Sequence, residues 1–545
     1  MKVKPKLKNH IQNRKEQKQY KPKYFTIQFK QKLQKNEQKQ NKKGVQQRFN
    51  SINNTYVYIN AEGKTQKKRD FQNKKNNNKE GQNFEGINIL DALSASGLRT
   101  IRFLKELKNI NKIYANDISD ASHKLMMENF ILNELDLSKI EMTQKDAIQL
   151  LYEHRFRLNK GDLSAKLHVI DLDPYGTAVP FLDCALQAAC FDTLLCVTST
   201  DSRILCGQDT QKCYYLYGSS RAKMQAFQEN AIRILLYTLN NTANKYSKHI
   251  VPLICYLSEF YVRCFILVKN GKQECGKSIL KTGNIFNCDN CGNFYTQPFG
   301  KSLKNEKLER FAPTNLNIPS NKCDQCGNNF TINGPVWIDK LNDEDFVNKT
   351  IQFLNQQQCQ LKLQTKEKIN GMLHAITLEQ QIQLDQIPYG FSIEHISKYL
   401  KTTIPSKKKI YSAYMSLGYN IEQSYLNPII FKTNASSEIV FDIMRNWVFF
   451  EFLQIYIKQF IFYFIFEKKE KYIIKRTNPN FDLNIKIDKA IPKWIPNPEK
   501  NWGPGKRAIA KKIIDDGIQE EKVDQLLIEN QDILYDKLQK KNKQD

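Results

Sequence analysis

One segment of the chain places a carboxylate, a proline and an aromatic ring side by side after a hydrophobic run. The run starts at Val169 and leads into Asp173, Pro174, Tyr175 and Gly176. Proline fixes φ and lacks an N–H donor, so the Asp173 carboxylate and the Pro174 carbonyl can both point beyond the end of a strand. An exocyclic amine on a nucleobase is a poor nucleophile, because its lone pair is delocalised into the ring. Acceptors that orient its N–H groups, beside a ring on which the base stacks, would support chemistry at that nitrogen.

Three earlier sites have the residue types of a nucleoside-binding crevice. In Asp91-Ala-Leu-Ser-Ala-Ser-Gly97 a carboxylate ends a run that reads as a strand, and small residues lead into a helix. Small residues let the backbone approach a ligand, and a helix N-terminus offers unpaired N–H groups. Asp117 ends the next apolar run, and Asp146-Ala147 follows a third. Each is also an ordinary turn or helix cap when taken alone, but three in this order favour a binding site.

Four cysteines form two matched pairs. Cys288 and Cys291 make one Cys-x-x-Cys, Cys323 and Cys326 make the other, and 31 residues separate the pairs. Glycine follows each pair and permits the tight turn of a metal knuckle. Four thiolates would close a tetrahedral Zn²⁺ site with no open position, which predicts a structural metal. A redox dithiol is the competing interpretation.

The elements that must position these residues follow a regular alternation from about residue 85. Apolar runs predict strands, and amphipathic stretches between them predict helices. The expected strands are 87–91, 113–117, 139–143, 167–171 and 194–199, and the expected helices are 98–107, 121–135, 178–189 and 221–237. This alternation predicts an α/β doubly wound parallel sheet, whose ligands bind at the carboxyl ends of the strands.

Two further runs, 250–257 and 260–268, are separated by only two residues and predict an antiparallel pair. A parallel sheet that ends in such a pair is typical of S-adenosylmethionine-dependent methyltransferases. In that fold an acidic residue at the tip of the second strand binds the ribose hydroxyls, which is the position of Asp117. The adenine is held after the third strand, where Asp146-Ala147 lies.

Composition narrows the class of protein. The chain has 545 residues, 83 Lys+Arg and 56 Asp+Glu, giving a net charge of +27 that favours a polyanionic partner, with nucleic acid ahead of membrane. Residues 1–50 contribute 16 Lys/Arg against 2 Asp/Glu. We expect residues 1–55 to be a disordered basic arm, either a solvated tail or a nucleic-acid-binding or import segment. Thirteen cysteines are too few for a disulfide scaffold, and no secretory signal opens the chain, which predicts an intracellular protein.

The motifs together resemble the tRNA (guanine-26 N2)-dimethyltransferase family from about residue 57 to 510. The resemblance rests on the segments already described and on four more, which are Thr198-Ser-Thr-Asp201, Cys213-Tyr-Tyr-Leu-Tyr-Gly218, Gly334-Pro-Val-Trp-Ile338 and Asn501-Trp-Gly-Pro504. It implies dimethylation of the exocyclic N2 of guanine 26 in tRNA, with S-adenosylmethionine as methyl donor.

Site residues carried over from the resemblance fall into two groups. Cofactor binding falls on Arg99, Asp117, Asp146 and Ala147, and on an upstream arginine for which Arg69 in Lys68-Arg69-Asp70 is the choice. The match to Asp173-Pro174-Tyr175 implies that Asp173 is the catalytic acceptor, with Asp171 as the alternative.

Four segments are expected along the chain. They are the arm (1–55), a class I methyltransferase domain (56–270), an α+β C-terminal tRNA-binding domain with the zinc site (271–510), and a charged terminal helix or tail (511–545). We expect a monomer in the nucleus, with mitochondrion or cytoplasm as alternatives, and no membrane association. Two other functions stay open: a base N-methyltransferase acting on another RNA or DNA, and a catalytically inactive zinc-containing RNA-binding protein.

One stretch departs from the family pattern. Residues 448–466 are rich in Phe, Ile and Tyr and approach the ~20 residues of a membrane span, but Glu451 and Lys458 would then lie in hydrocarbon. Relatives join the flanking segments more directly, and the Phe/Ile/Tyr/Lys bias is what AU-rich RNA encodes. The segment is therefore predicted to be a retained intron or a recent insertion, with a buried helix or strand as the structural expectation.

Overall fold

The computed structural model describes residues 86–207, 209–258, 260–305, 308–318, 320–356, 365–456, 477–485 and 493. These residues belong to one compact unit, 49–495. The expected segments 1–55 and 511–545, Arg69 and Asn501-Trp-Gly-Pro504 lie outside the described residues.

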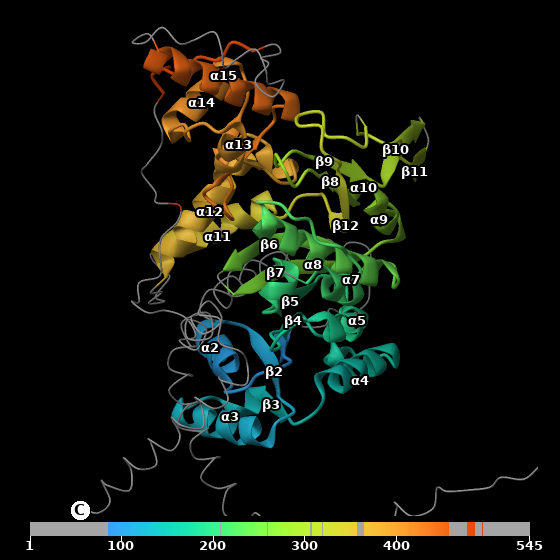
Figure 1. The fold of residues 1–545 in the computed structure, drawn as a ribbon. Helices are drawn as coiled ribbons and strands as arrows, with labels where there is room; N and C mark the ends of the chain where they lie inside the picture. The colour runs from blue at the N-terminus through green and yellow to red at the C-terminus, as the bar shows by residue number, and fades with distance from the viewer. Residues whose placement is uncertain are drawn as a thin grey trace, which may run out of the picture. The chain divides into compact units, whose positions relative to one another are not determined.

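A seven-stranded sheet organises the first half of the described chain (Figure 1). Its order is β3-β2-β1-β4-β5-β7-β6. The strands are β1 (Ile87–Asp91), β2 (Ile110–Asn116), β3 (Ile140–Thr143), β4 (Val169–Leu172), β5 (Thr193–Ser199), β6 (Lys248–Ser258) and β7 (Tyr261–Asn270). Strands β1 to β5 pair in parallel, whereas β7 pairs antiparallel with both β5 and β6. The predicted doubly wound methyltransferase sheet with its antiparallel pair is confirmed.

Both faces of the sheet are covered. Successive strand residues point to opposite faces, so Leu90 joins one core and Ile89 the other. The first face packs against α4 (Ala147–Asn159), α5 (Val179–Ala188) and α8 (Phe227–Asn244). The second packs against α2 (Leu98–Glu106), α11 (Glu344–Asn355) and α12 (Lys366–Gln381). A small separate cluster joins α2 to α3 (Asp120–Leu132).

The helix predicted at 221–237 is displaced in the structure, because α8 spans Phe227–Asn244. The reason is a pairing that is remote in sequence. Ser220 forms an isolated bridge with Gly334, donating N–H to O at 2.8 Å and accepting at 2.9 Å, and this keeps the chain before α8 extended. Helix α7 (Thr210–Tyr217) precedes this bridge.

The second half is α+β, as expected. One three-stranded sheet has the order β12-β8-β9, from β8 (Thr282–Asn287), β9 (Phe294–Pro298) and β12 (Thr331–Trp337). Strands β10 (Gly300–Asn305) and β11 (Leu308–Pro313) form a ribbon, and β13 (Phe391–Ser392), β15 (Ile430–Thr433) and β14 (Ile421–Gln423) form a third sheet. The second half also contains the helices α13 (Ile393–Leu400), α14 (Lys407–Ser416) and α15 (Ser437–Tyr456).

The core continues across the expected boundary near residue 271. The cluster that contains Leu90 also contains Val336 and Trp337 of β12, and Arg233 of α8 donates to the Trp337 carbonyl at 3.0 Å. The two halves therefore share buried side chains. Among the described residues, no helix is long and apolar enough to cross a membrane.

Candidate functional site

The carboxyl ends of β1, β2 and β4 meet where the strand order reverses. Strand β1 lies between β2 and β4, and the chain leaves β1 and β4 toward different sides of the sheet. The loop after β1 is held against both neighbours, because Ala92 N–H donates to the Asp171 carbonyl at 3.1 Å and Ser94 N–H donates to the Asn116 carbonyl at 2.7 Å. Ligands of open α/β sheets bind in the crevice at such a point.

Arg99 lies between the loop after β1 and the residue after β4. Its side chain is 2% exposed, and its Nε donates to Asp91 Oδ1 at 3.0 Å. The same guanidinium donates from Nη2 to the Leu93 carbonyl at 2.6 Å and from Nη1 to Asp173 Oδ2. Burial raises the pKa of Asp91, and the nearby Arg99 opposes that effect. Arg99 therefore ties the loop after β1 to the residue that follows β4.

Asp171, the alternative acceptor, has a different environment. It is fully buried, and Arg263 of β7 donates to its two carboxylate oxygens at 3.1 Å and 2.7 Å. Asp173 is 13% exposed and lies two residues further along the chain. Of the two carboxylates, Asp173 is the one with solvent exposure.

The turn from Asp173 to Gly176 presents an aromatic ring to solvent. Pro174 is buried, whereas Tyr175 is 90% exposed. Gly176 has φ +86, a backbone conformation that side chains disfavour, and its N–H donates to Thr200 Oγ1 at 2.7 Å. Thr200 N–H in turn donates to the Gly176 carbonyl at 2.8 Å. The ring of Tyr175 is therefore exposed on a turn whose backbone is fixed.

Asp117 follows β2, and its carboxylate organises the loops on either side of it. Oδ2 accepts from Ala95 N–H at 2.9 Å, and Oδ1 accepts from Ser119 N–H at 3.0 Å. Gly97 also has a packing role. It has φ +74, and a Cβ there would meet the Phe130 ring at 2.5 Å, so close packing of α2 on α3 requires the glycine.

Asp146 and Ala147 begin α4. Asp146 is exposed and caps the helix by accepting from Ile148 N–H at 2.7 Å, and Ala147 is buried. These two residues have the geometry of a helix cap at the carboxyl end of β3. An aspartate cap of this kind satisfies one of the free N–H groups of the helix.

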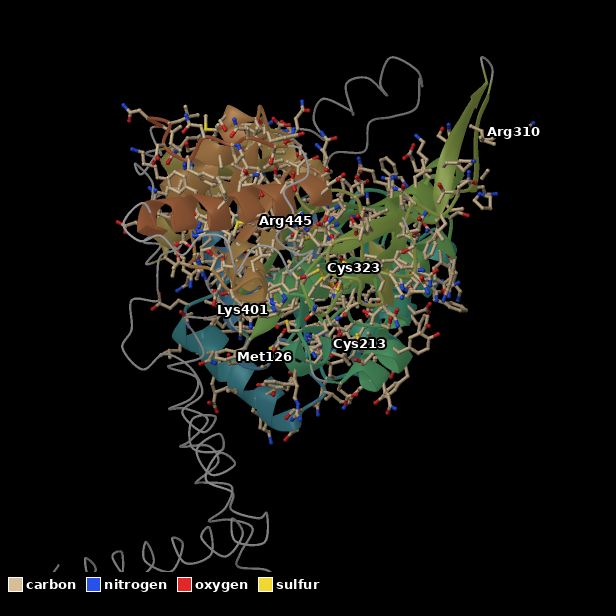
Figure 2. All side chains as sticks on the ribbon, turned by 45° about the horizontal axis from the view of Figure 1, so that its top comes forward. Met126, Cys213, Arg310, Cys323, Lys401 and Arg445 are labelled. Carbon is tan, nitrogen blue, oxygen red and sulfur yellow. The ribbon has the colours of Figure 1, made fainter. Side chains whose placement is uncertain are left out.

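The four predicted cysteines come together. Their Sγ atoms all lie within 4.8 Å of one another, with Cys288 and Cys326 at 3.3 Å and Cys291 and Cys323 at 3.6 Å (Cys323 is labelled in Figure 2). Both expected knuckle turns are present, because Gly292 and Gly327 have φ +79 and +75. Each glycine N–H donates to the carbonyl of the first cysteine of its pair, at 3.0 Å and 2.8 Å. Of the other described cysteines, five are buried, while 190, 206 and 275 are half-buried.

Two important residues of the site were not predicted from the sequence. Arg263 lies in an apolar strand and is noticeable only as a lone charge there. Tyr217 lies in the Cys213–Gly218 motif, and its hydroxyl reaches Asp201 and Thr177. Ser220, just after this motif, pairs with Gly334. Three segments behind the resemblance, 198–201, 213–218 and 334–338, are therefore linked through hydrogen bonds to the Asp173–Gly176 turn or to Thr177 beside it.

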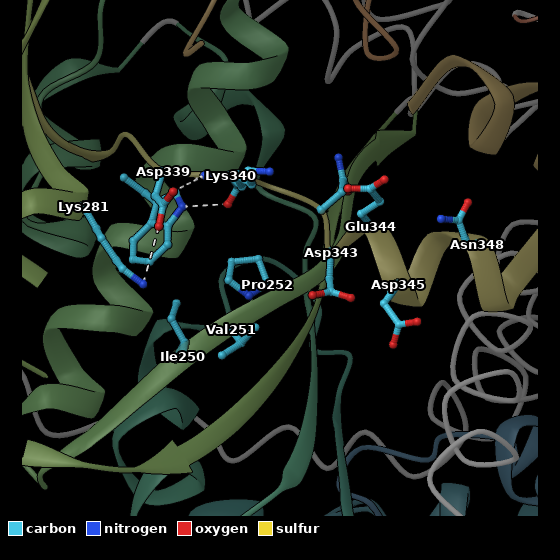
Figure 3. Close-up of a pocket in the computed structure, with 12 residues that line it drawn as sticks. Ile250, Val251, Pro252, Lys281, Asp339, Lys340, Asp343, Glu344, Asp345 and Asn348 are labelled. Carbon is cyan, nitrogen blue, oxygen red and sulfur yellow. Dashed lines mark hydrogen bonds and ion pairs between the residues drawn. The ribbon is translucent and has the colours of Figure 1, made fainter. Parts of the chain in front are cut away.

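A cavity of about 570 Å³ lies beside the edge strand β6, away from the carboxyl ends of β1, β2 and β4 (Figure 3). Its Ile250 pairs with Val268, which pairs with Thr193 at the start of β5. Two of the carboxylates around it have local partners: Asp339 pairs with Lys281 at 3.5 Å, and Asp343 caps α11 by accepting from Phe346 N–H at 2.8 Å. None of the predicted site residues lines this cavity.

Comparison with known proteins identifies the family. The family model for N2,N2-dimethylguanosine tRNA methyltransferase matches residues 23–445. The tRNA (guanine(26)-N(2))-dimethyltransferase of Mus musculus is 32% identical over 434 residues, which cover 78% of this chain and 62% of that protein. The Homo sapiens relative gives 32%, 78% and 63%, and the Schizosaccharomyces pombe relative gives 33%, 79% and 77%. The chain thus spans just under two thirds of the length of the mouse and human relatives.

A solved structure agrees with the sequence relatives. The structure of Trm1 from Pyrococcus horikoshii in complex with S-adenosyl-L-methionine is 26% identical, with a TM-score of 0.56. The match covers 73% of this chain and 93% of that one. From its sheet, its motifs and these matches, the chain belongs to the N2,N2-dimethylguanosine tRNA methyltransferase family.

Proposed function

We propose that the protein transfers methyl groups from S-adenosylmethionine to the exocyclic N2 of guanine 26 in tRNA, giving N2,N2-dimethylguanosine. The observation that carries this proposal is the placement of Asp173, Pro174 and the exposed Tyr175 at the switch point of a methyltransferase sheet in a chain of this family. The relatives named above, which carry the same activity in their names, support it.

The chemistry assigned to this turn is the orientation of an amine. The Asp173 carboxylate accepts an N–H of the guanine amino group and takes up the proton released when the nitrogen gains its methyl. Arg99 holds this carboxylate in place from below. Tyr175, being 90% exposed, offers a face on which a guanine turned out of its stack can lie.

The cofactor is assigned to the loops after β1, β2 and β3. When bound, S-adenosylmethionine supplies an electrophilic methyl group. Asp117 suits the ribose, because a carboxylate has about four lone-pair sites and its two oxygens each accept only one backbone N–H bond among the described residues. Asp146 and Ala147 are assigned to the adenine, and Arg99 acts on the cofactor through the loop that it fixes. Arg69 remains an assignment from the resemblance alone.

The cysteine cluster is assigned to a structural Zn²⁺. A tetrahedral site with Zn–S near 2.3 Å has sulfur atoms about 3.8 Å apart. The 3.3 Å and 3.6 Å separations and the 4.8 Å limit are compatible with that size. Asn293 Nδ2 also donates to Cys323 Sγ at 3.5 Å, a bond suited to a thiolate. The cluster joins the connection between β8 and β9 to the segment before β12, and its cysteines pack with buried residues of α13, α14 and α15. Holding the C-terminal half together for tRNA is the role we assign to it.

The macromolecular partner is assigned as tRNA, bound by a monomer. The Lys/Arg excess of the chain supports a nucleic-acid partner. A nuclear location is part of the proposal, while the Saccharomyces cerevisiae relative carries a mitochondrial designation in its name.

Nucleoside analysis tests the proposal. In the first experiment, tRNA from cells lacking the protein is digested to nucleosides, which are analysed by mass spectrometry. In the second, purified protein acts on a tRNA transcript with guanine or adenine at position 26. We expect loss of dimethylguanosine in the cells and product only on the guanine transcript. Normal dimethylguanosine at position 26 in the deletion strain would contradict the proposal.

A further inference from the structure

The Tyr217 hydroxyl links the residue just after the Asp173–Gly176 turn to the segment just after β5. Its side chain is 1% exposed, and its hydroxyl oxygen lies 2.9 Å and 2.8 Å from the two carboxylate oxygens of Asp201. The same oxygen lies 2.8 Å from Thr177 Oγ1. Thr177 follows the Asp173–Gly176 turn, and Asp201 follows β5.

The direction of these hydrogen bonds can be assigned. Burial and the neighbouring Asp201 carboxylate raise the pKa of Tyr217, so its hydroxyl keeps its proton near neutral pH. A carboxylate only accepts, so the Tyr217 O–H donates to Asp201 and the Tyr217 oxygen accepts from Thr177. Thr177 Oγ1 accepts in turn from Val179 N–H at 3.2 Å, at the start of α5. The chain of bonds therefore runs from Val179, the first residue of α5, to Asp201, two residues after β5.

Tyr217 is itself held in place. It is the last residue of α7, which ends at Gly218, where the left-handed conformation at φ 65 closes the helix. Thr238 of α8 donates from Oγ1 to the Tyr217 carbonyl at 2.8 Å. A residue fixed at both its backbone and its hydroxyl can hold a neighbouring turn in one geometry.

We propose that Tyr217 is a positioning residue that acts through the Thr177 and Asp201 hydrogen bonds to hold the turn bearing Asp173 and Tyr175 at the distance that methyl transfer requires. The inference rests on the proposed function and deepens it. It assigns the Cys213–Gly218 motif a role in the turnover step rather than in cofactor binding. A misplacement of about 1 Å can cost on the order of 10²-fold in rate.

The test compares Tyr217→Phe with Tyr246→Phe in the full chain. Both variants keep the ring and lose a hydroxyl bonded to an aspartate, because Tyr246 donates to Asp183 at 2.7 Å, on α5 beyond the turn. We expect Tyr217→Phe to lower single-turnover methylation at saturating tRNA and cofactor by about 10- to 100-fold, with the cofactor Kd unchanged within about twofold. Tyr246→Phe should keep the wild-type rate. Thr177→Val should act non-additively with Tyr217→Phe, since both break the same chain.

Amide hydrogen exchange supplies a readout that does not need activity. Exchange at residues 176–179 should accelerate at least several-fold in Tyr217→Phe and stay at the wild-type rate in Tyr246→Phe. Wild-type turnover together with unchanged exchange in Tyr217→Phe overturns the positioning role. A rate loss matched by an equal loss of cofactor affinity overturns it as well. If the wild-type protein methylates no tRNA, the proposed function fails, and unchanged exchange in Tyr217→Phe would still refute the positioning of the turn.

Discussion

The guanidinium of Arg99 donates to the carboxylate of Asp173, although 74 residues separate them along the chain. The same guanidinium is paired with Asp91, which is fully buried at the end of β1. One buried cation therefore joins the loop assigned to the cofactor and the carboxylate assigned to the target base. Loss of the Asp173 carboxylate and loss of the charge that pairs with Asp91 should therefore have different consequences.

Asp173→Ala should abolish methyl transfer while leaving cofactor binding largely intact. Removal of an orienting acceptor is expected to cost on the order of 10²–10⁴-fold in rate. Single-turnover methylation and calorimetric cofactor binding measure the two effects separately. Asp171→Asn is the matched comparison: it should mainly lower the free energy of unfolding, because Arg263 loses a charged partner inside the sheet. Near-normal turnover by Asp173→Ala would move the acceptor to another residue.

Arg99→Met should destabilise the protein by about 3–5 kcal/mol near neutral pH, because it leaves the Asp91 charge buried without its partner. The pKa of Asp91, already raised by burial, rises further in this variant. A carboxyl with a raised folded-state pKa favours the fold below its unfolded pKa and loses that advantage as pH rises through the folded pKa. The loss in free energy of unfolding relative to wild type should therefore become smaller as pH is lowered. Denaturant titrations at several pH values measure it. A deficit independent of pH would show that Asp91 is not the group left unpaired, and adding Asp91→Asn should restore part of the stability.

The sheet was predictable because its signals are local. Strand β1 was predicted at 87–91 and is found there, and the carboxylates at the ends of β1, β2 and β4 were placed correctly by the alternation of strands and helices. The Cys-x-x-Cys pairs likewise carry their own geometry, since each turn needs only its cysteines and the following glycine. Pattern and spacing sufficed for these features.

The remaining features depend on contacts between distant residues. The start of α8 is set by the Ser220–Gly334 bridge, and the glycine at 97 is required by Phe130 on another helix. Arg99 reaches Asp173 across 74 residues and Arg263 reaches Asp171 across 92, so the sequence around each arginine does not reveal these contacts. The hydroxyl contacts of Tyr217 are of the same kind. In each case the tertiary partner decides the role, and a motif shows only that a residue type is present.

Zinc should bind with about one ion per chain, and Cys291→Ser should lower both metal content and thermal stability. Structural four-cysteine sites contribute folding energy, so a chelator should lower the Tm of the wild-type protein. Elemental analysis and thermal scans measure the two effects. Cys190→Ser is the control, because Cys190 is half-buried and outside the cluster. Equal metal content in the two variants would contradict the assignment.

Binding of tRNA should weaken steeply with salt, and deletion of residues 1–55 should lower affinity more than turnover at saturating tRNA. The arm carries 14 of the chain's 27 net positive charges within residues 1–50. Lysines and arginines that displace counterions from phosphates give a linear fall of log K with log salt. Filter binding at several salt concentrations gives the affinity and the slope for both forms. An unchanged slope after deletion would leave the arm as an address segment or a spacer.

The segment 448–466 should prove not to anchor the protein in a membrane. Its first part continues α15, where Phe450 stacks on Trp447 at 5.5 Å between ring centroids and approaches Phe481 at 5.3 Å. The Glu451 carboxylate accepts from the hydroxyls of Thr402 and Thr403, so the charge that disfavours a span has partners within the fold. These contacts favour an insertion over a retained intron as far as Glu451, while residues 457–466 and Lys458 lie outside the described residues.

Each charge placed in hydrocarbon would cost roughly 2.5–3.5 kcal/mol. Sequencing the mature transcript decides between insertion and intron, and fractionation with an alkaline wash tests the anchor. We expect the alkaline wash to release the protein. The interpretation would be wrong if the transcript keeps these codons and the protein stays in the membrane fraction after the wash.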